Sequence, residues 1–195
     1  METVLILDFG AQYSQLIARR VREQNVYCEV KPCSISPDEI RKLAPIGIIL
    51  SGGPQSVYES VSLHVDPALF SLGIPVLGIC YGCQLMAYSL GGTVAAATEA
   101  TAREYGKTLT EFDTESAIFH GLPASSVTWM SHGDYISQVP DGFTVTAKTA
   151  VCPTAAMACP EKKLYGVQFH PEVQHTVQGS EILRRFLYSV CGASG

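Results

Sequence analysis

Short apolar runs that alternate with segments of helical periodicity constrain the fold of this chain most strongly. Residues 4–7, 46–50 and 74–79 are mostly apolar, which predicts strands buried on both faces of a sheet. Between the first two runs, residues 11–24 carry apolar side chains at helical spacing. Strands and helices in this order favour an α/β fold with a doubly wound, mainly parallel open sheet and helices on both faces.

The second half of the chain has more strand character. Helices are predicted at residues 37–43, from residue 66, at 82–90 and at 179–190. Further strands are predicted at residues 26–30, 93–97, 107–112, 127–130, 143–149, 155–158 and 164–169. Some of the later strands are expected to form an antiparallel extension at the sheet edge. Residues 1–195 show no repeat or linker, so they are interpreted as a single domain.

Composition argues against several classes of partner. The 195 residues are 47% hydrophobic with a net charge of −5, so a nucleic-acid-binding surface is not expected. No apolar stretch approaches the roughly 20 residues that span a bilayer. The N-terminus is too acidic for a secretory signal, so no membrane partner is expected. Seven scattered cysteines, an odd number, favour reduced thiols and a cytoplasmic location.

The strongest chemical signal is Cys80, which lies between Gly78 and Gly82 after a predicted strand and before a predicted helix. This spacing is typical of a nucleophile elbow, in which small residues allow a tight turn that exposes the nucleophile. The positive N-terminus of the following helix would favour a thiolate. Taken alone, the motif is equally compatible with a buried structural cysteine beside a turn.

His170 and Glu172 form a second motif with Pro171 between them. Proline keeps the preceding residue extended, and side chains two apart on an extended chain point to the same side. Glu172 could therefore orient His170 as a base for Cys80. A surface histidine beside a carboxylate is the alternative. The other histidines show no metal-ligand spacing, so no metal site is expected.

The turn at residues 51–54, Ser-Gly-Gly-Pro, also follows a predicted strand. It lacks the spacing and the lysine of a phosphate-binding loop. The backbone amides of Gly53 and Tyr81 are therefore interpreted as an oxyanion hole. A tight turn that needs glycine for conformational reasons is the alternative.

Together, the motifs at residues 51–54, 78–84 and 166–172 resemble those of class I, triad-type glutamine amidotransferases, which have a flavodoxin-like sheet. The resemblance runs over essentially the whole chain. Segments 7–13, 19–23, 129–134 and 170–176 resemble the glutaminase domain of GMP synthetases in particular. The family usually has methionine where this chain has Cys83.

The resemblance implies a role for each matching residue. Cys80 would attack the carboxamide of glutamine and form a thioester, His170 would transfer protons, and Glu172 would orient His170. The amides of Gly53 and Tyr81 would stabilise the oxyanion. The amino-acid end of glutamine would be bound by Gln84, Ser131, Gly133 and Asp134, although residues 131–134 could also be only a polar loop.

The resemblance also implies a partner. GMP synthetases use the released ammonia in an ATP-pyrophosphatase part, which converts XMP to GMP, and they have a dimerisation part. Neither part is recognised in these 195 residues, so an excised domain or a separate subunit is expected. The glutaminase itself would need no cofactor, and ATP and magnesium would belong to the synthetase part.

Three alternatives use the same residues differently. Cys80 and Cys83 form a Cys-x-x-Cys pair at a helix start, as in dithiol redox proteins. That interpretation leaves the His170–Glu172 motif unexplained. Another class I amidotransferase, or a hydrolase of γ-glutamyl or peptide bonds, would keep the fold and the nucleophile. A non-catalytic binding module would not need the intact cysteine, histidine and glutamate.

Overall fold

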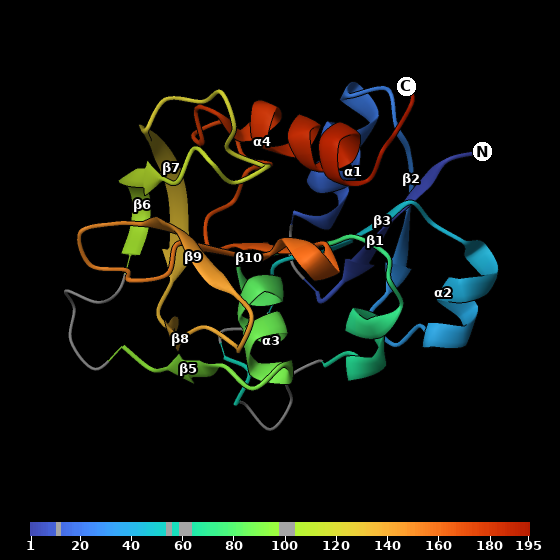
Figure 1. Ribbon diagram of the computed structural model, residues 1–195, viewed down its shortest axis with the longest axis horizontal. Coiled ribbons are helices and arrows are strands. Elements are labelled where there is room, and N and C mark those ends of the chain that lie inside the picture. Colours follow the sequence, from blue (N-terminus) through green and yellow to red (C-terminus); the bar gives the residue numbers. More distant parts are fainter. Residues whose placement is uncertain (11–12, 54–55, 59–63, 98–103) are drawn as a thin grey trace.

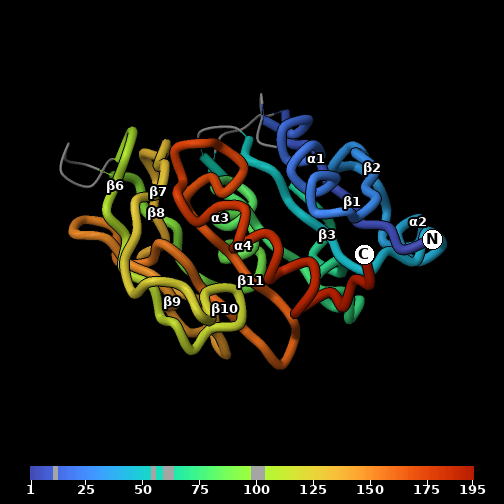
Figure 2. The backbone as a smooth tube through the Cα atoms, turned by 90° about the horizontal axis from the view of Figure 1, so that it is seen from above, coloured from blue at the N-terminus to red at the C-terminus, as the bar shows by residue number. Residues whose placement is uncertain are grey.

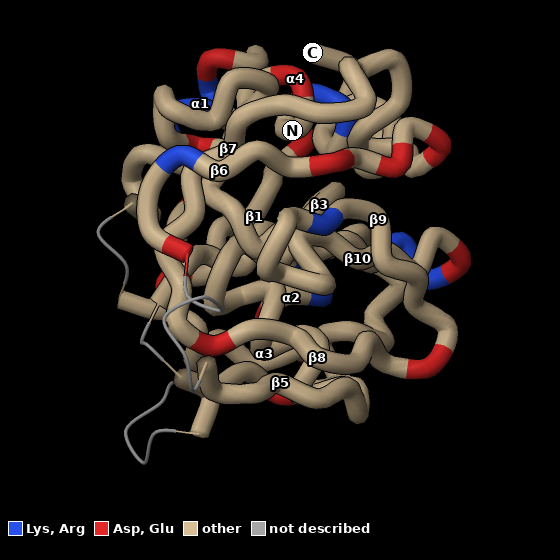
Figure 3. The backbone as a smooth tube through the Cα atoms, turned by 90° about the vertical axis from the view of Figure 1, so that its left-hand side faces the viewer, with Lys and Arg blue, Asp and Glu red and all other residues tan. Residues whose placement is uncertain are grey.

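The computed structural model describes residues 1–10, 13–53, 56–58, 64–97 and 104–195. The start of the first predicted helix, at residue 11, and Pro54 of the predicted turn lie outside the described residues. Within them, no helix has the length and apolar character needed to cross a membrane. Figure 3 shows basic and acidic positions interspersed on the side that it draws, without a continuous basic band.

A nine-stranded sheet forms the centre of the molecule, in the order β2-β1-β3-β4-β11-β10-β9-β6-β7. The first five strands in this order pair in parallel, and the remaining four extend the sheet by antiparallel pairing. The parallel part comprises β2 (Tyr27–Pro32), β1 (Thr3–Asp8), β3 (Gly47–Leu50), β4 (Val76–Ile79) and β11 (Leu164–Val167). The antiparallel part comprises β10 (Ala156–Cys159), β9 (Thr144–Lys148), β6 (Glu104–Phe112) and β7 (Ser125–His132). This confirms the predicted α/β class and the antiparallel extension.

Helices cover both faces of the sheet. Helices α1 (Ser14–Glu23) and α4 (Gly179–Arg185) lie on one face, and α3 (Tyr81–Ser89) lies on the other (Figure 1). Strand β1 shows why two faces are needed. Its residues Val4 and Ile6 belong to the hydrophobic cluster under α1 and α4. Leu5 and Leu7 belong to the cluster that contains α3 residues. An apolar run without alternation thus fills two cores at once.

Short-range signals fix several helix ends. Helix α2 (Pro37–Leu43) begins at the predicted capping box, where the Glu39 amide donates to Ser36 Oγ at 3.2 Å. The helix predicted after Asp66 is only a 3-10 turn, Pro67–Ser71, because Gly73 and Pro75 follow at once. The last predicted helix, residues 179–190, changes at Phe186 from α geometry to a π turn, Phe186–Val190.

One strand was not predicted. Strand β8 (Tyr135–Gln138) pairs antiparallel with β5 (Thr93–Ala95) in a separate two-stranded sheet. A second 3-10 turn, Pro160–Lys162, connects β10 to β11. Figure 2 shows the antiparallel strands β6, β7 and β9 at the opposite end of the molecule from β1, β2 and both termini. The termini are joined where Ser194 donates to the Glu2 carboxylate.

Candidate active site

Cys80 occupies the turn between β4 and α3. Its backbone has φ 53° and ψ −108°, a combination rarely adopted by a residue with a side chain. Hydrogen bonds hold it there: the Cys80 amide donates to Val167 O at 2.8 Å, and its carbonyl accepts from the Gln84 amide at 3.1 Å. The structure therefore shows the strained strand–turn–helix geometry that a nucleophile elbow requires.

The two glycines that flank the elbow are required by close contacts. A Cβ atom on Gly78 would lie 2.6 Å from the Gly82 carbonyl oxygen, and one on Gly82 would lie 2.5 Å from Leu50 O. Both distances involve backbone atoms, which cannot move aside without displacing β3 or α3. Glycine at these positions lets α3 start directly against the sheet.

His170 and Glu172 follow the end of β11 and are nearly inaccessible to solvent. The His170 amide donates to Trp129 O at 3.0 Å, and Thr176 Oγ1 donates to the His170 carbonyl at 2.6 Å. The ring atom Nδ1 of His170 lies 2.9 Å from Glu172 Oε2. The histidine is thus held by its backbone and by its ring.

Burial alone would lower the pKa of His170, but hydrogen bonds and charge interactions with Cys80 and Glu172 raise it to about 11. An imidazole flanked by a carboxylate and a thiolate is stabilised as imidazolium. At neutral pH the His170 ring is therefore favoured in its protonated form.

Three groups of the described residues lie next to the Cys80 sulfur. It is hydrogen-bonded to the His170 side chain, and it lies 3.6 Å from Ser131 O and 3.6 Å from Gln168 Nε2. Gln168 was not among the residues singled out from the sequence. Its position directly after β11 and two residues before His170 is the signal that could have found it. The chain from residue 168 to residue 172 contains bends and a turn, so the extended segment expected through Glu172 is not formed.

The four residues predicted to bind the amino-acid end of glutamine come from α3, from the end of β7 and from the bend that follows β7. The buried Gln84 side chain, on α3, donates from Nε2 to Asp134 O at 3.0 Å. Ser131 is exposed to solvent, while Gly133 and Asp134 are half-buried. We call these four residues the rim; Ser131 O lies 3.6 Å from the Cys80 sulfur, and the binding of glutamine by the rim stays a prediction.

The predicted oxyanion residues are also neighbours. A Cβ atom on Gly53 would lie 3.0 Å from Tyr81 Cδ1 and 2.7 Å from Phe9 Cβ. The Tyr81 and Phe9 rings pack with their centroids 5.5 Å apart. Glycine at residue 53 thus lets the turn after β3 approach the start of α3, beside the nucleophile.

This arrangement can be compared with known proteins. The family model of glutamine amidotransferase class-I matches residues 5–190. The chain belongs to the class-I glutamine amidotransferase family.

Individual relatives of this amidotransferase include GMP synthases. GMP synthase (glutamine-hydrolyzing) of Clostridium botulinum strain Alaska E43 is 55% identical over 194 residues, which are 100% of this chain and 37% of that protein. The GMP synthase of Geobacillus kaustophilus is 54% identical over 194 residues, with 100% and 38% covered. The amidotransferase chain therefore spans little more than a third of the length of these curated relatives.

Solved structures show the same fold. A protein from Thermoplasma acidophilum, described as one subunit of a GMP synthase, has a TM-score of 0.87 and 32% identity, over 98% of this chain and 94% of that chain. A glutamine amidotransferase of Thermotoga maritima has a TM-score of 0.77 over 98% and 99% of the two chains. Its 20% identity supports the amidotransferase fold alone.

A buried polar network stands behind the rim of the amidotransferase site. His132 Nε2 lies 3.0 Å from Glu104 Oε1, and His132 Nδ1 lies 2.8 Å from Asp134 O. Thr149 Oγ1 donates to Glu104 Oε2 at 2.7 Å. Glu104, His132 and Cys152 each offer one possible metal-ligand atom, and these three atoms lie within 4.8 Å of one another. Protein partners already satisfy these atoms, so the network fits a structural role better than a metal site.

Cys83 does not have the environment of a redox partner for Cys80. It is fully buried in α3, and a Cβ atom on Gly166 of β11 would lie 2.6 Å from its sulfur. Burial raises the pKa of Cys83 well above its ordinary value. A dithiol catalyst needs a second thiol that can ionise and react, so the amidotransferase geometry disfavours this alternative.

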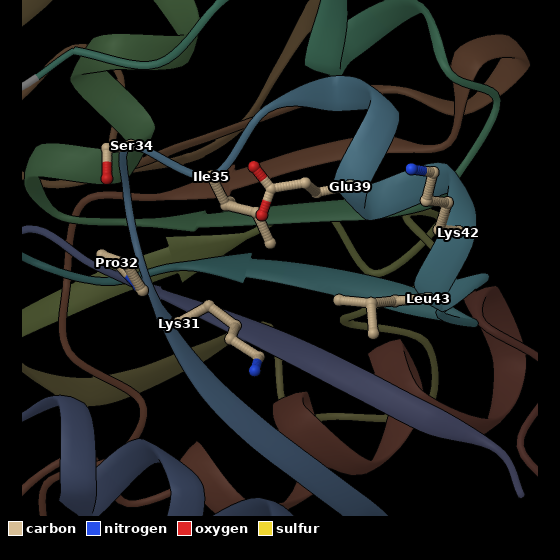
Figure 4. Close-up of a pocket in the computed structure, with 7 residues that line it drawn as sticks. All are labelled: Lys31, Pro32, Ser34, Ile35, Glu39, Lys42 and Leu43. Carbon is tan, nitrogen blue, oxygen red and sulfur yellow. The ribbon is translucent and has the colours of Figure 1, made fainter.

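The amidotransferase also has a separate pocket between the end of β2 and α2 (Figure 4). Its volume is about 530 Å³, and it is lined by Lys31, Pro32, Ser34, Ile35, Glu39, Lys42 and Leu43. Among the described residues that line it, none belongs to the predicted site. It is a surface recess beside β2, which forms one edge of the large sheet, and Cys80 does not line it.

Proposed function

We propose that this chain is the glutaminase part of a GMP synthase. The observation that carries the proposal is the continuous series Cys80–His170–Glu172, in which the sulfur contacts an imidazole held 2.9 Å from a buried carboxylate. The relatives that this chain matches over its full length, at 55% and 54% identity, support GMP synthesis as the use of the ammonia.

The proposed reaction begins with attack of the Cys80 thiolate on the carboxamide carbon of glutamine. The carbonyl electrons move to oxygen, which the amides of Gly53 and Tyr81 stabilise. As the C–N bond breaks, His170 gives its proton to the departing nitrogen and ammonia leaves. A glutamyl thioester remains on Cys80, and Glu172 keeps the His170 ring oriented throughout.

Hydrolysis completes the cycle. His170, now neutral, takes a proton from a water molecule, and the resulting hydroxide attacks the thioester carbon. The C–S bond breaks, glutamate leaves, and the thiolate–imidazolium pair is restored. Ser131, Gly133, Asp134 and Gln84 are proposed to hold the amino-acid end of glutamine.

The remaining part of the proposal concerns the partner. The curated relatives have nearly two thirds of their length outside the matched region. We assign to that remainder the ATP-pyrophosphatase part, which with ATP and magnesium would convert XMP to GMP. The seven cysteines, all in the described part of the chain, are free thiols, which supports a cytoplasmic location.

The test is glutamate release from glutamine by the wild-type chain and by Cys80→Ala. Each is assayed alone and with a GMP synthase ATP-pyrophosphatase subunit supplied with XMP and ATP. Release that needs Cys80 and increases with the charged partner supports both parts of the proposal. Glutamate release that does not change when the partner is added contradicts the GMP assignment. Glutamate release by Cys80→Ala contradicts the proposed thioester intermediate.

A further inference from the structure

We propose that the Gln168 carboxamide is a catalytic hydrogen-bond donor to the Cys80 thiolate, and that Gln84 is the residue that orients it. The inference rests on the proposed glutaminase function and assigns two further roles within that site. It begins from the 3.6 Å contact between Gln168 Nε2 and Cys80 Sγ, in which an amide faces the reacting atom.

Hydrogen bonds link Asp134 O to Gln84, Gln84 to Gln168, and Gln168 to Cys80. The backbone carbonyl of Asp134 determines which group donates in each of them. Asp134 O can only accept, so Gln84 must present its NH₂ group to it, at 3.0 Å. The same Gln84 nitrogen donates its second hydrogen to Gln168 Oε1, also at 3.0 Å. Because its oxygen is occupied by a donor, Gln168 must present its NH₂ group to the sulfur. A flipped Gln168 would place two NH₂ groups against each other.

Burial makes the contact chemically significant. Gln168 is fully buried and Gln84 is 3% exposed, so water cannot replace the donor. The Gln168 backbone is also fixed, because its amide donates to Ala155 O at 2.8 Å. A hydrogen bond to a charged acceptor in such surroundings is stronger than one exposed to solvent.

The donor favours the thiolate over the thiol. Ser131 O can only accept a hydrogen bond from the thiol, whereas the Gln168 NH₂ group can only donate one to the sulfur and so stabilises negative charge there. The charge on sulfur disappears when the thioester forms and returns when the C–S bond breaks. Gln168 therefore acts on the nucleophile at rest and on the leaving thiolate during hydrolysis.

Alkylation of Cys80 by iodoacetamide tests the donor without involving glutamine. The rate is measured near pH 6 and near pH 9.5, where ordinary cysteines are respectively thiol and mostly thiolate. Alkylated Cys80 is identified by peptide mass spectrometry, because six other cysteines are present. The variants are Gln168→Leu, which removes the donor, and Gln84→Met, which keeps the Gln168 donor but removes the hydrogen bond that orients it. Gln138→Leu changes an exposed glutamine at the end of β8 and is the control.

Loss of one hydrogen bond to a charged group should lower the rate of Gln168→Leu near pH 6 by about tenfold and leave the rate near pH 9.5 unchanged. Gln84→Met should show a smaller loss of the same kind, and the control none. Equal rates in Gln168→Leu and wild type near pH 6 would overturn the proposal. So would equal losses at both pH values, which would indicate only altered access to Cys80.

Two further measurements keep the result interpretable. If Gln168→Leu does not fold, as judged by circular dichroism, Gln84→Met decides, because it removes no contact with the sulfur. An unchanged rate near pH 6 in that variant then overturns the orienting role and the donor geometry derived from it. Glutamate release by the wild-type chain is assayed separately, so failure of the glutaminase assignment is distinguished from failure of the donor assignment.

Discussion

The Nδ1 atom of His170 lies 2.9 Å from Oε2 of Glu172, and both side chains are buried. This contact determines which end of the imidazole is available to Cys80. With Nδ1 turned to the carboxylate, Nε2 remains for the sulfur and, after attack, for the nitrogen that leaves. The carboxylate also stabilises the positive ring, which a neutral partner could not do.

Replacing Glu172 by glutamine should change the pH dependence of the glutaminase. The wild-type His170 pKa of about 11 keeps the imidazolium intact, so glutamate release at saturating glutamine should be level between about pH 7 and pH 9. In Glu172→Gln one of the groups that raise this pKa is lost, so release should decline within that interval as the ring loses its proton. Parallel profiles for the two proteins would contradict this.

The same shift predicts how stability depends on pH. The folded-state pKa of His170 is raised above the ordinary value of 6.5, so its contribution is fully present below about pH 6.5. That contribution decreases as the pH rises towards 11. Urea denaturation across this range should show a smaller decrease for His170→Gln than for wild type. Equal decreases would argue that the ring carries no proton in the folded protein.

Gly82→Ala should destabilise the protein by more than about 2 kcal/mol, because the new Cβ would meet a backbone oxygen of β3. Gly91→Ala is the matched comparison. Gly91 has φ 94°, but a Cβ at this residue would have nothing within 4 Å, so only the backbone cost of about 1 kcal/mol applies there. Urea denaturation gives both free energies, and a smaller loss in Gly82→Ala would refute the close-packing explanation.

Thr149→Val should weaken both the fold and the binding of glutamine. It removes the donor to Glu104 Oε2 and should cost about 1–3 kcal/mol of unfolding free energy. Because His132 connects Glu104 to the carbonyl of Asp134, the rim should shift and the KM for glutamine should rise more than kcat falls. Thr144→Val, at an exposed position of β9, is the control. An unchanged KM would show that the Glu104–His132 network does not influence the binding of glutamine.

Cys83→Ala should leave the kcat for glutamate release nearly unchanged, since the sulfur is buried in the core and packs against Gly166 of β11. The expected cost is a modest loss of stability from the small cavity. A dithiol mechanism would instead lose all activity in this variant. Steady-state kinetics and a thermal melt of the same preparation distinguish the two outcomes.

The sequence allowed prediction of elements that depend on neighbours along the chain. The apolar run at residues 4–7 and the Ser36 capping box identified β1 and the start of α2 because each signal lies within the element itself. Strand β8 was missed because its stability comes from pairing with β5, some forty residues earlier in the chain. A four-residue strand with one buried side chain leaves little local pattern.

The candidate site divides in the same way. Cys80 and His170 lie in motifs whose glycine and proline residues constrain the local backbone, so the residues themselves indicated the chemistry. Gln168 and His132 depend on partners distant in sequence: Gln84 is 84 residues from Gln168, and Glu104 is 28 residues from His132. An uncharged amide, moreover, gives no sign of its partner until the fold is known.

The order in which these residues occur along the chain has a consequence during protein synthesis. The sulfur of Cys80 meets Ser131 O and Gln168 Nε2 across 51 and 88 residues, respectively. A nascent chain that has emerged only as far as β6 carries the nucleophile but none of these partners, nor its histidine. The Cys80 thiol is therefore synthesised well before these partners, which can approach it only once β11 pairs with β4 in the sheet.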